Sequence, residues 1–185
     1  MTSEQHRTQT ELEAGLEHIR RSPKEAGVLQ LIVRRPAIEE REVLEVGELD
    51  LAAGLVGDTW RSRGSSRTAD GSAHPDMQLT VMNARTIALL AGEPARWPLA
   101  GDQLYVDLDL GLENAPPGTR LAVGSAVIEI TAQPHTGCQK FEARFGREAL
   151  KLTASAAGKA LQLRGRNARV VQPGVIRRGD PVRKL

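Results

Sequence analysis

Short apolar runs of strand length, separated by glycine and proline turns, follow one another along most of this chain. The clearest is 104–110, where leucine and valine alternate with Tyr105, Asp107 and Asp109. Alternation with a period of two is typical of a half-buried strand. Many short strands with few long helices favour a β-barrel and disfavour the strand–helix alternation of a βαβ fold. The sequence therefore predicts a mainly β fold, a barrel with a few short peripheral helices.

Turn residues place the other elements. Further strands are predicted at 27–33, 41–51, 77–81, 120–123, 126–131 and within 170–184. Only Gly124 and Ser125 separate the fourth run from the fifth, as in a hairpin with a tight turn. Asn83 is predicted to cap a helix that ends at Gly92, and the Ala-, Lys- and Arg-rich residues 139–162 are predicted to be helical in part.

The N-terminal region differs from the rest. Residues 10–22 have the apolar spacing of an amphipathic helix, and Thr10 and Glu13 have the spacing of a capping box. The polar tail before this helix is expected to be mobile. A length of 185 residues suits about one domain. We therefore predict a tail and short helix over 1–22 and a single barrel domain over 23–185.

Charge is unevenly distributed along the chain. Residues 1–137 carry 13 Lys and Arg against 20 Asp and Glu, a net of −7, whereas residues 138–185 carry 12 against 3, a net of +9. Either the last quarter faces an anion, or it pairs with the acidic part of the same fold. Phe141 and Phe145 are the only aromatic residues in this quarter. Single-stranded nucleic acid, whose bases stack on aromatic rings, is therefore disfavoured as a partner.

Targeting features point to the cytoplasm. The chain has no run of 18 apolar residues, and its first residues lack the apolar segment of a secretory signal. The expected location is therefore cytoplasmic, with no membrane partner. A single cysteine, Cys138, excludes an internal disulfide and a Cys-rich zinc module.

Cys138 is the candidate reactive residue. It stands just before a predicted helix start at Gln139, and His135, Lys140 and Arg144 are close in sequence. A helix N-terminus and nearby cations both favour the thiolate form. A thiolate can act as a nucleophile, carry a persulfide or ligate a soft metal. The alternative is a small side chain with a packing role, which is common for an isolated cysteine.

Two other features leave functional and structural interpretations open. His135 and Cys138 have the spacing of two metal ligands, and His74 is the only further candidate; a structural or exposed histidine is the alternative for each. His74 lies in the polar stretch 61–75, which is long enough to be either functional or disordered. Neither a GxSxG elbow nor a phosphate-binding P-loop occurs in the sequence.

Four segments and the cysteine occur in an order that matches a known family. The segments are 54–58 (GLVGD), 78–82 (QLTVM), 101–104 (GDQL) and 118–127 (GTRLAVGSAV), and Cys138 follows them. Together they resemble the MOSC domain, which forms the C-terminal module of molybdenum-cofactor sulfurases and also occurs as small stand-alone bacterial proteins. The resemblance covers about residues 27–183 and implies a MOSC-type β-barrel with its cysteine in a cleft.

The sequence departs from the family pattern in three places. Gly137 precedes the cysteine where proline is common. Asp102 and Gln103 replace the usual glutamate and asparagine before the strand that starts at Leu104. Thr59 follows Asp58 where arginine is frequent. These positions bear on substrate contacts more than on the chemistry of the cysteine.

The resemblance implies that the chain binds molybdenum cofactor (molybdopterin), or a related sulfur-bearing ligand, through Cys138. Its activity would be either reduction of N-hydroxylated compounds or sulfur transfer. As an oxidoreductase, the chain would use Cys138 as a molybdenum ligand and would need a separate electron-transfer protein. As a sulfur carrier, it would hold a persulfide on Cys138. No pyridoxal phosphate motif is present. The residues expected to bind the cofactor are Asp58, Arg61, Arg63, His135, Lys140 and Arg144.

Alternative interpretations are open for these residues and for the function of the chain. Asp58 could instead hold its own turn, and the arginines of 61–75 could be solvated charges. A non-enzymatic module whose basic quarter binds nucleic acid or an acidic protein would leave Cys138 incidental. Thiol chemistry on peroxides or electrophiles is a third option, but the chain contains no second cysteine that could act as a resolving thiol.

Overall fold

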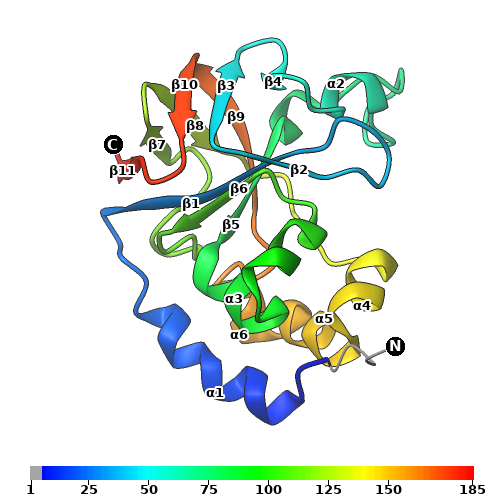
Figure 1. Ribbon diagram of the computed structural model, residues 1–185, viewed down its shortest axis with the longest axis vertical. Helices are drawn as coiled ribbons and strands as arrows, with labels where there is room; N and C mark the ends of the chain where they lie inside the picture. Colours follow the sequence, from blue (N-terminus) through cyan, green and yellow to red (C-terminus); the bar gives the residue numbers. More distant parts are fainter. Residues whose placement is uncertain (1–5) are drawn as a thin grey trace.

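The computed structural model describes residues 6–185, and seven of its strands form a closed barrel (Figure 1). The ring runs in the order β11-β7-β8-β9-β5-β6-β1, and pairing of β1 with β11 closes it. The strands are β1 (Ala26–Arg34), β2 (Glu42–Leu44), β3 (Val46–Asp50), β4 (Gly54–Leu55), β5 (Leu79–Asn83), β6 (Leu104–Asp107), β7 (Arg120–Val123), β8 (Ala126–Ile130), β9 (Arg166–Gln172), β10 (Gly174–Arg177) and β11 (Pro181–Lys184). The predicted barrel is confirmed.

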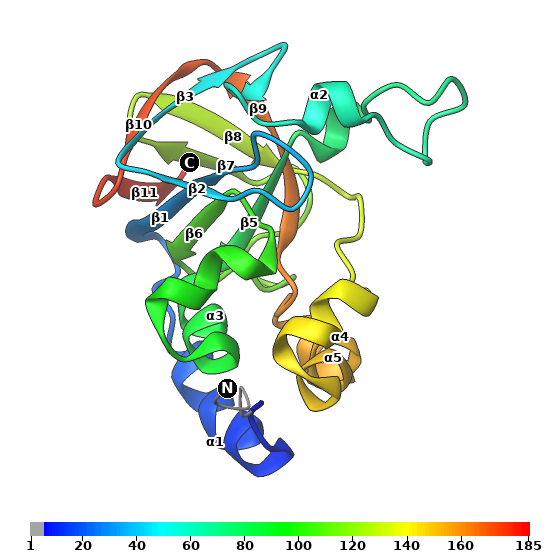
Figure 2. The ribbon, with the colours of Figure 1, turned by 45° about the vertical axis from the view of Figure 1, so that its right-hand side comes forward.

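Short helices pack outside the barrel. They are α1 (Gln9–Arg20), α2 (Trp60–Arg63), α3 (Ala84–Ala91), α4 (Gln139–Phe145), α5 (Arg147–Ala154) and α6 (Ala156–Ala160), with 3-10 helices η1 (Pro75–Met77) and η2 (Pro94–Ala100). Figures 1 and 2 show all the longer helices gathered at one end of the barrel, opposite a small sheet of β10, β3 and β4. Within residues 6–185, no helix is long and apolar enough to cross a bilayer.

Strand β1 organises the ring because three strands share its length. Its first residues pair with β11, its middle with β6 and its last three with β2, all antiparallel. Strands β5 and β6 are parallel neighbours. Parallel pairing needs a long crossover connection, and α3 and η2 provide it. The sequence predicted both strands but not this relation between them.

Apolar side chains fill the barrel and also cover its helical side. Inside lie fully buried residues such as Leu29, Leu104 and Val106. On the other face of the same strands, Met82 and Tyr105 pack with the helices. The Tyr105 hydroxyl donates to the Trp97 carbonyl at 2.9 Å. Both faces of β6 are therefore buried, although the alternation predicted one polar face.

The N-terminal helix begins one residue earlier than predicted and its capping box lies two residues earlier. Its capping box uses Thr8 and Glu11, not Thr10 and Glu13. The Glu11 carboxylate accepts a 2.7 Å hydrogen bond from the backbone N–H of Thr8, whereas Glu13 accepts one from the side chain of Gln9. The helix ends at Arg20, before Pro23. The tail predicted to be mobile falls largely on residues 1–5, which lie outside the described residues.

Two predicted strands are shorter than expected. Met77 belongs to the 3-10 helix η1, because the His74 ring accepts a hydrogen bond from the Asp76 N–H and so starts a helical turn there. Strand β6 ends at Asp107, and the Asp109 side chain accepts a hydrogen bond from Gly111 N–H in a turn. The helix capped by Asn83, the 120–130 hairpin and the C-terminal strands are confirmed.

Half of the twelve Lys and Arg residues in the basic C-terminal quarter pair with acidic residues of the preceding part of the fold. Arg169 bridges Asp76 and Glu129, and Arg178 pairs with Glu45. Further pairs join Lys184 to Glu25 and Arg164 to Asp102. The intramolecular interpretation of the charge asymmetry therefore accounts for much of the +9 balance, which weakens the alternative of a basic docking module.

Candidate functional site

Cys138 lies at the edge of a cleft of about 230 Å³ on one side of the barrel. The thiol is free and exposed, and the residue is the N-cap of α4, as predicted. Four segments that are distant in sequence form the walls: the loop 35–41 after β1, the ends of α2, residues 100–101 before β6, and residues 135–144. Thr80 and Arg164 complete the lining.

Five of the seven predicted site residues line this cleft. They are Cys138, Arg63, His135, Lys140 and Arg144. The other two are not among its lining residues. Asp58 is fully buried behind it, and Arg61 is exposed on α2. The structure thus brings most of the set together, and their roles in ligand binding stay predictions.

Asp58 holds a cleft residue rather than facing the cleft itself. Its carboxylate accepts hydrogen bonds from Arg35 Nε and Nη2 at 2.8 and 2.7 Å, and from the Arg35 and Trp60 backbone N–H groups at 3.0 and 2.9 Å. Burial alone would raise the pKa of Asp58, but the hydrogen bonds and charge of Arg35 hold that pKa below its ordinary value. Asp58 therefore fixes Arg35 and the start of α2.

Most cations of the cleft already have a carboxylate partner. Arg35 pairs with Asp58, and Arg164 pairs with the fully buried Asp102 at 2.7 Å. Lys140 and Arg144 both pair with Glu39, which comes from the loop on the opposite wall. These pairs cancel much of the positive charge that the sequence placed beside Cys138.

Arg41 and Arg63 are the exceptions. Among residues 6–185, neither guanidinium has a carboxylate within ion-pair distance, although Arg41 Nη1 donates to the Glu40 carbonyl at 2.6 Å. Arg41 Nε is buried and has no hydrogen-bond partner among those residues. Burial, together with the charge of Arg35, lowers the pKa of both arginines. Uncompensated positive charge in a partly buried cleft favours an anionic ligand.

His135 forms a wall between the cleft and two adjoining cavities of about 150 Å³ each. Its Nδ1 atom lies 3.4 Å from Asp102 Oδ1, and neither buried atom has a hydrogen-bond partner among the described residues. Burial, with the nearby charges of Arg164 and Arg35, holds the pKa of His135 well below its ordinary value. The imidazole is therefore neutral at pH 7.

The close approach of His135 and Asp102 depends on Gly165. This residue has φ +101°, and a Cβ there would lie 2.7 Å from the Val81 carbonyl oxygen and 3.2–3.3 Å from the two side chains. The same segment supplies Arg164, which lies over the Phe141 ring at 4.9 Å and so links β9 to α4. The sequence marked Asp102 only as part of a motif and did not single out Arg164.

One adjoining cavity shares Arg35, Arg63, Thr80 and His135 with the cleft and extends to His74. His74 uses its ring to cap η1. No group of three or more His, Cys, Asp or Glu side chains is placed to hold a metal ion anywhere in residues 6–185. The stretch 61–75 is tied to the segment before Cys138 through Arg67, whose side chain donates to the Gln133 side chain and the Pro134 carbonyl.

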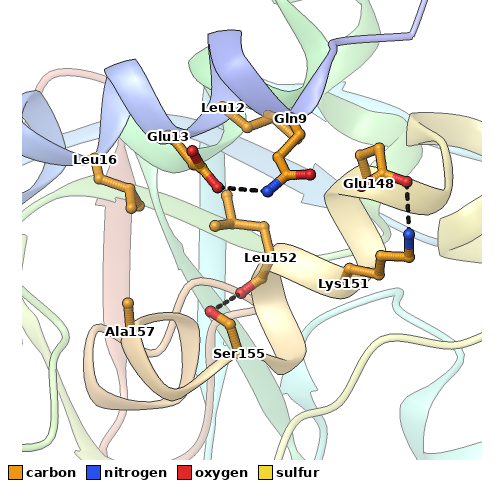
Figure 3. A pocket seen from close by; sticks show the side chains of 9 residues that line it. All are labelled: Gln9, Leu12, Glu13, Leu16, Glu148, Lys151, Leu152, Ser155 and Ala157. Carbon is orange, nitrogen blue, oxygen red and sulfur yellow. Dashed lines mark hydrogen bonds and ion pairs between the residues drawn. The ribbon is translucent and has the colours of Figure 1, made fainter.

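A separate groove of about 410 Å³ lies between α1 and the α5–α6 region (Figure 3). Leu12 and Leu16 face Leu152 and Ala157 across it. Polar side chains on its walls contact neighbours on their own helix, Gln9 with Glu13 and Lys151 with Glu148. Cys138 and the arginines lie outside this groove, so it is not part of the candidate site.

Sequence and structure comparisons agree on one fold. A family model of the MOSC domain matches residues 68–183. The structure is similar to YuaD from Bacillus subtilis, with a TM-score of 0.62 and 16% identity over 85% of this chain and 94% of that one. It is also similar to YiiM from Escherichia coli, with a TM-score of 0.55 and 20% identity over 85% and 69%. For YiiM from Geobacillus stearothermophilus, the TM-score is 0.52 and the identity 14% over 89% and 74%.

At these identities, likeness to solved structures establishes the fold alone. No curated protein matches the sequence. The fold and the sequence family are therefore the information that the comparisons add to the geometry of the cleft.

Proposed function

The chain belongs to the MOSC domain family, and from this premise we propose that its cleft binds a phosphate-bearing molybdopterin ligand through Cys138. The observation that carries the proposal is the juxtaposition of an exposed thiol with Arg41 and Arg63, two arginines without a carboxylate partner among residues 6–185. A ligand that combines a soft metal–sulfur centre with a phosphate matches this pair of features.

The residues of the cleft fit such a group. Thiolate sulfur is a ligand that soft metal centres prefer, and Cys138 is the only thiol in the chain. Arginine forks bind phosphate oxygens with two parallel hydrogen bonds. The buried Nε of Arg41 has no hydrogen-bond partner among the described residues, and an anion beside this guanidinium would offset its unpaired charge, which supports the proposal. Cys138 would therefore hold the metal, and Arg41 and Arg63 the phosphate.

When bound, the molybdenum centre supplies redox or sulfur chemistry at the end of the cleft occupied by Cys138. The chain's own residues shape the surroundings. Asp58 keeps Arg35 in the wall, and Asp102 lies beside Nδ1 of His135, whose neutral imidazole can hydrogen-bond to a ligand without adding charge. The family resemblance favours reduction of N-hydroxylated compounds with an external electron donor. The exposure of Cys138 also suits a sulfur carrier, because a persulfide must reach its acceptor.

We expect protein purified from a cofactor-making host to contain molybdenum and pterin in roughly stoichiometric amounts. The Cys138→Ser variant should contain neither. Metal analysis and pterin fluorescence after oxidation measure the two contents. The host must load a second molybdoenzyme in the same culture as a positive control. Absence of both components from the wild type would contradict cofactor binding, and persulfide labelling of Cys138 would then test the carrier function.

Two neighbouring arginines provide a matched test of the phosphate contact. Both arginines are exposed, but Arg63→Gln removes a cation that lines the cleft, whereas Arg61→Gln removes a cation of the same helix that does not line it. Loss of a charge-assisted hydrogen bond costs about 1.5–3 kcal/mol, so pterin affinity should fall by roughly 10-fold to 100-fold in Arg63→Gln. Pterin retention during dialysis measures this fall. Equal retention by both variants would show that Arg63 does not bind the ligand.

A further inference from the structure

The loop 36–41 carries an acidic residue across the mouth of the cleft. Glu39 has φ 63°, a left-handed conformation that non-glycine residues rarely adopt and that is often retained for a functional reason. Its two carboxylate oxygens accept from different partners on α4: one from Lys140 Nζ, and the other from Arg144 Nη2 at 2.7 Å. The strained loop thus places a carboxylate against two cations that lie more than 100 residues away in the sequence.

These contacts are at the solvent side of the cleft. Glu39 and Lys140 side chains are 53% and 66% exposed, whereas Arg144 is 21% exposed and is also held by the Leu99 carbonyl at 2.8 Å. The hydrogen bond and charge of Lys140 lower the pKa of Glu39, so its carboxylate stays ionised near neutral pH. Ion pairs with this exposure contribute little stability and are readily exchanged. A competing anion can therefore take the place of Glu39.

The charge of an incoming anion determines whether it can displace Glu39 from Lys140 and Arg144. An incoming carboxylate would repeat the contacts that Glu39 already makes and would gain nothing from them. A phosphate monoester carries about −1.5 to −2 charges near pH 7 and three acceptor oxygens. It can bind Lys140 and Arg144 together and can also face Arg41, which lines the same cleft. The exchange therefore favours phosphate over carboxylate and over neutral ligands.

We propose that Glu39 is a specificity-determining residue, an internal anion that competes with the ligand phosphate for the cations of the cleft until a phosphate monoester displaces it. The inference rests on the proposed function for the identity of the ligand, and it adds the selection of that ligand by charge. Displacement frees the loop 36–41 from α4, because Glu39 provides the ion pairs that join them.

Alkylation of Cys138 tests the proposal on protein that contains no cofactor. Iodoacetate and iodoacetamide react with the same thiol, but only iodoacetate is negatively charged. The rate with iodoacetate divided by the rate with iodoacetamide therefore reports the local charge. Glu39→Gln keeps the size of the side chain and should raise this ratio by about 3-fold to 10-fold. The matched control is Glu40→Gln, the same change at the next residue, which has no ion pair among the described residues. Its ratio should change by less than about 2-fold, since exposed charges are screened.

Two further measurements test whether the change in alkylation depends on Lys140 and whether phosphate competes with Glu39. Adding Lys140→Gln to Glu39→Gln should return the ratio toward that of the wild type. Inorganic phosphate should protect Cys138 of Glu39→Gln from alkylation at roughly 10-fold lower concentration than it protects Cys138 of the wild type. This difference corresponds to about 1.4 kcal/mol for the competition by Glu39. Acetate should not protect the wild type. Equal ratios in Glu39→Gln and Glu40→Gln, or equal protection by phosphate with and without Glu39, would overturn the proposal. Because no pterin is used, this result is independent of whether the proposed cofactor binds.

Discussion

Replacing Asp58 by alanine is expected to lower the free energy of unfolding by about 3–5 kcal/mol, the cost of breaking a buried ion pair by removing one partner. The carboxylate is fully buried, and its two oxygens accept five hydrogen bonds, the longest of them from Gln103 Nε2 at 3.4 Å. The variant would leave the Arg35 guanidinium, whose side chain is only 10% exposed, with the Gly101 carbonyl as its remaining partner. An uncompensated charge would then remain beneath the cleft.

Urea unfolding at pH 7 measures the loss, and Asp76→Ala is the matched control. Asp76 also pairs with an arginine, Arg169, but both side chains are more than one-third exposed. An exposed pair contributes about 0–1 kcal/mol. A similar loss in the two variants would show that burial does not determine the contribution of Asp58.

The pH dependence of the Asp58 effect has a definite sign. Because the pKa of Asp58 is lower in the folded state than its ordinary value, the carboxylate stabilises the fold above its unfolded pKa, near pH 4. This contribution is lost as the pH falls through the folded pKa. The difference between wild type and Asp58→Ala should therefore be constant near neutral pH and shrink under strongly acidic conditions. A difference that grows on acidification would contradict the assignment.

Local patterns made the barrel predictable. Each strand of the hairpin 120–130 carries its own alternation, and a tight turn between them leaves one pairing available. The cap of α3 was equally local, because Asn83 bonds to backbone N–H groups two and three residues ahead. The parallel pairing of β5 and β6 was not predictable in this way. It depends on where the crossover of α3 and η2 packs, which no short pattern records.

The candidate site was predictable around Cys138 and less so elsewhere. Pro134 and Gly137 indicated a break before a helix, and the N-cap position of Cys138 followed from it. The charge of the cleft did not follow, because it depends on pairs made over long sequence distances. Lys140 looked available in the sequence, but Glu39 neutralises it. The sequence did not single out Arg41, which lines the cleft without a carboxylate partner among the described residues.

Replacing Arg164 by methionine is expected to cost about 3–5 kcal/mol of unfolding free energy at neutral pH, because the fully buried Asp102 would lose its cation. Arg164 donates to Asp102 Oδ2 at 2.7 Å and to the Ala100 carbonyl at 3.0 Å. Methionine is shorter than arginine but is unbranched and flexible, so it can retain an apolar contact with Phe141, over whose ring the guanidinium lies. The loss should therefore reflect charge rather than packing, and equilibrium unfolding in urea measures it.

A second substitution and a pH series separate this charge effect from a general loss of structure. Adding Asp102→Asn removes the unpaired carboxylate, so the double variant should be more stable than Arg164→Met alone, with a coupling of about 0.5–3 kcal/mol.

The pH series depends on the titration of Asp102. Burial raises the pKa of Asp102 even beside Arg164, so the folded state binds a proton there more tightly than the unfolded state does. The penalty for the charged carboxylate is thus absent below the unfolded pKa, builds as the pH rises toward the folded pKa and is complete above it. Arg164→Met should accordingly approach the stability of the wild type as the pH is lowered. Asp58→Ala should do the same, but for a different reason. In that comparison the wild type loses a favourable ion pair, whereas the Arg164→Met variant loses an unfavourable charge. Additive losses in the double variant, or a deficit that does not shrink with acidification, would show that Asp102 and Arg164 are not energetically coupled.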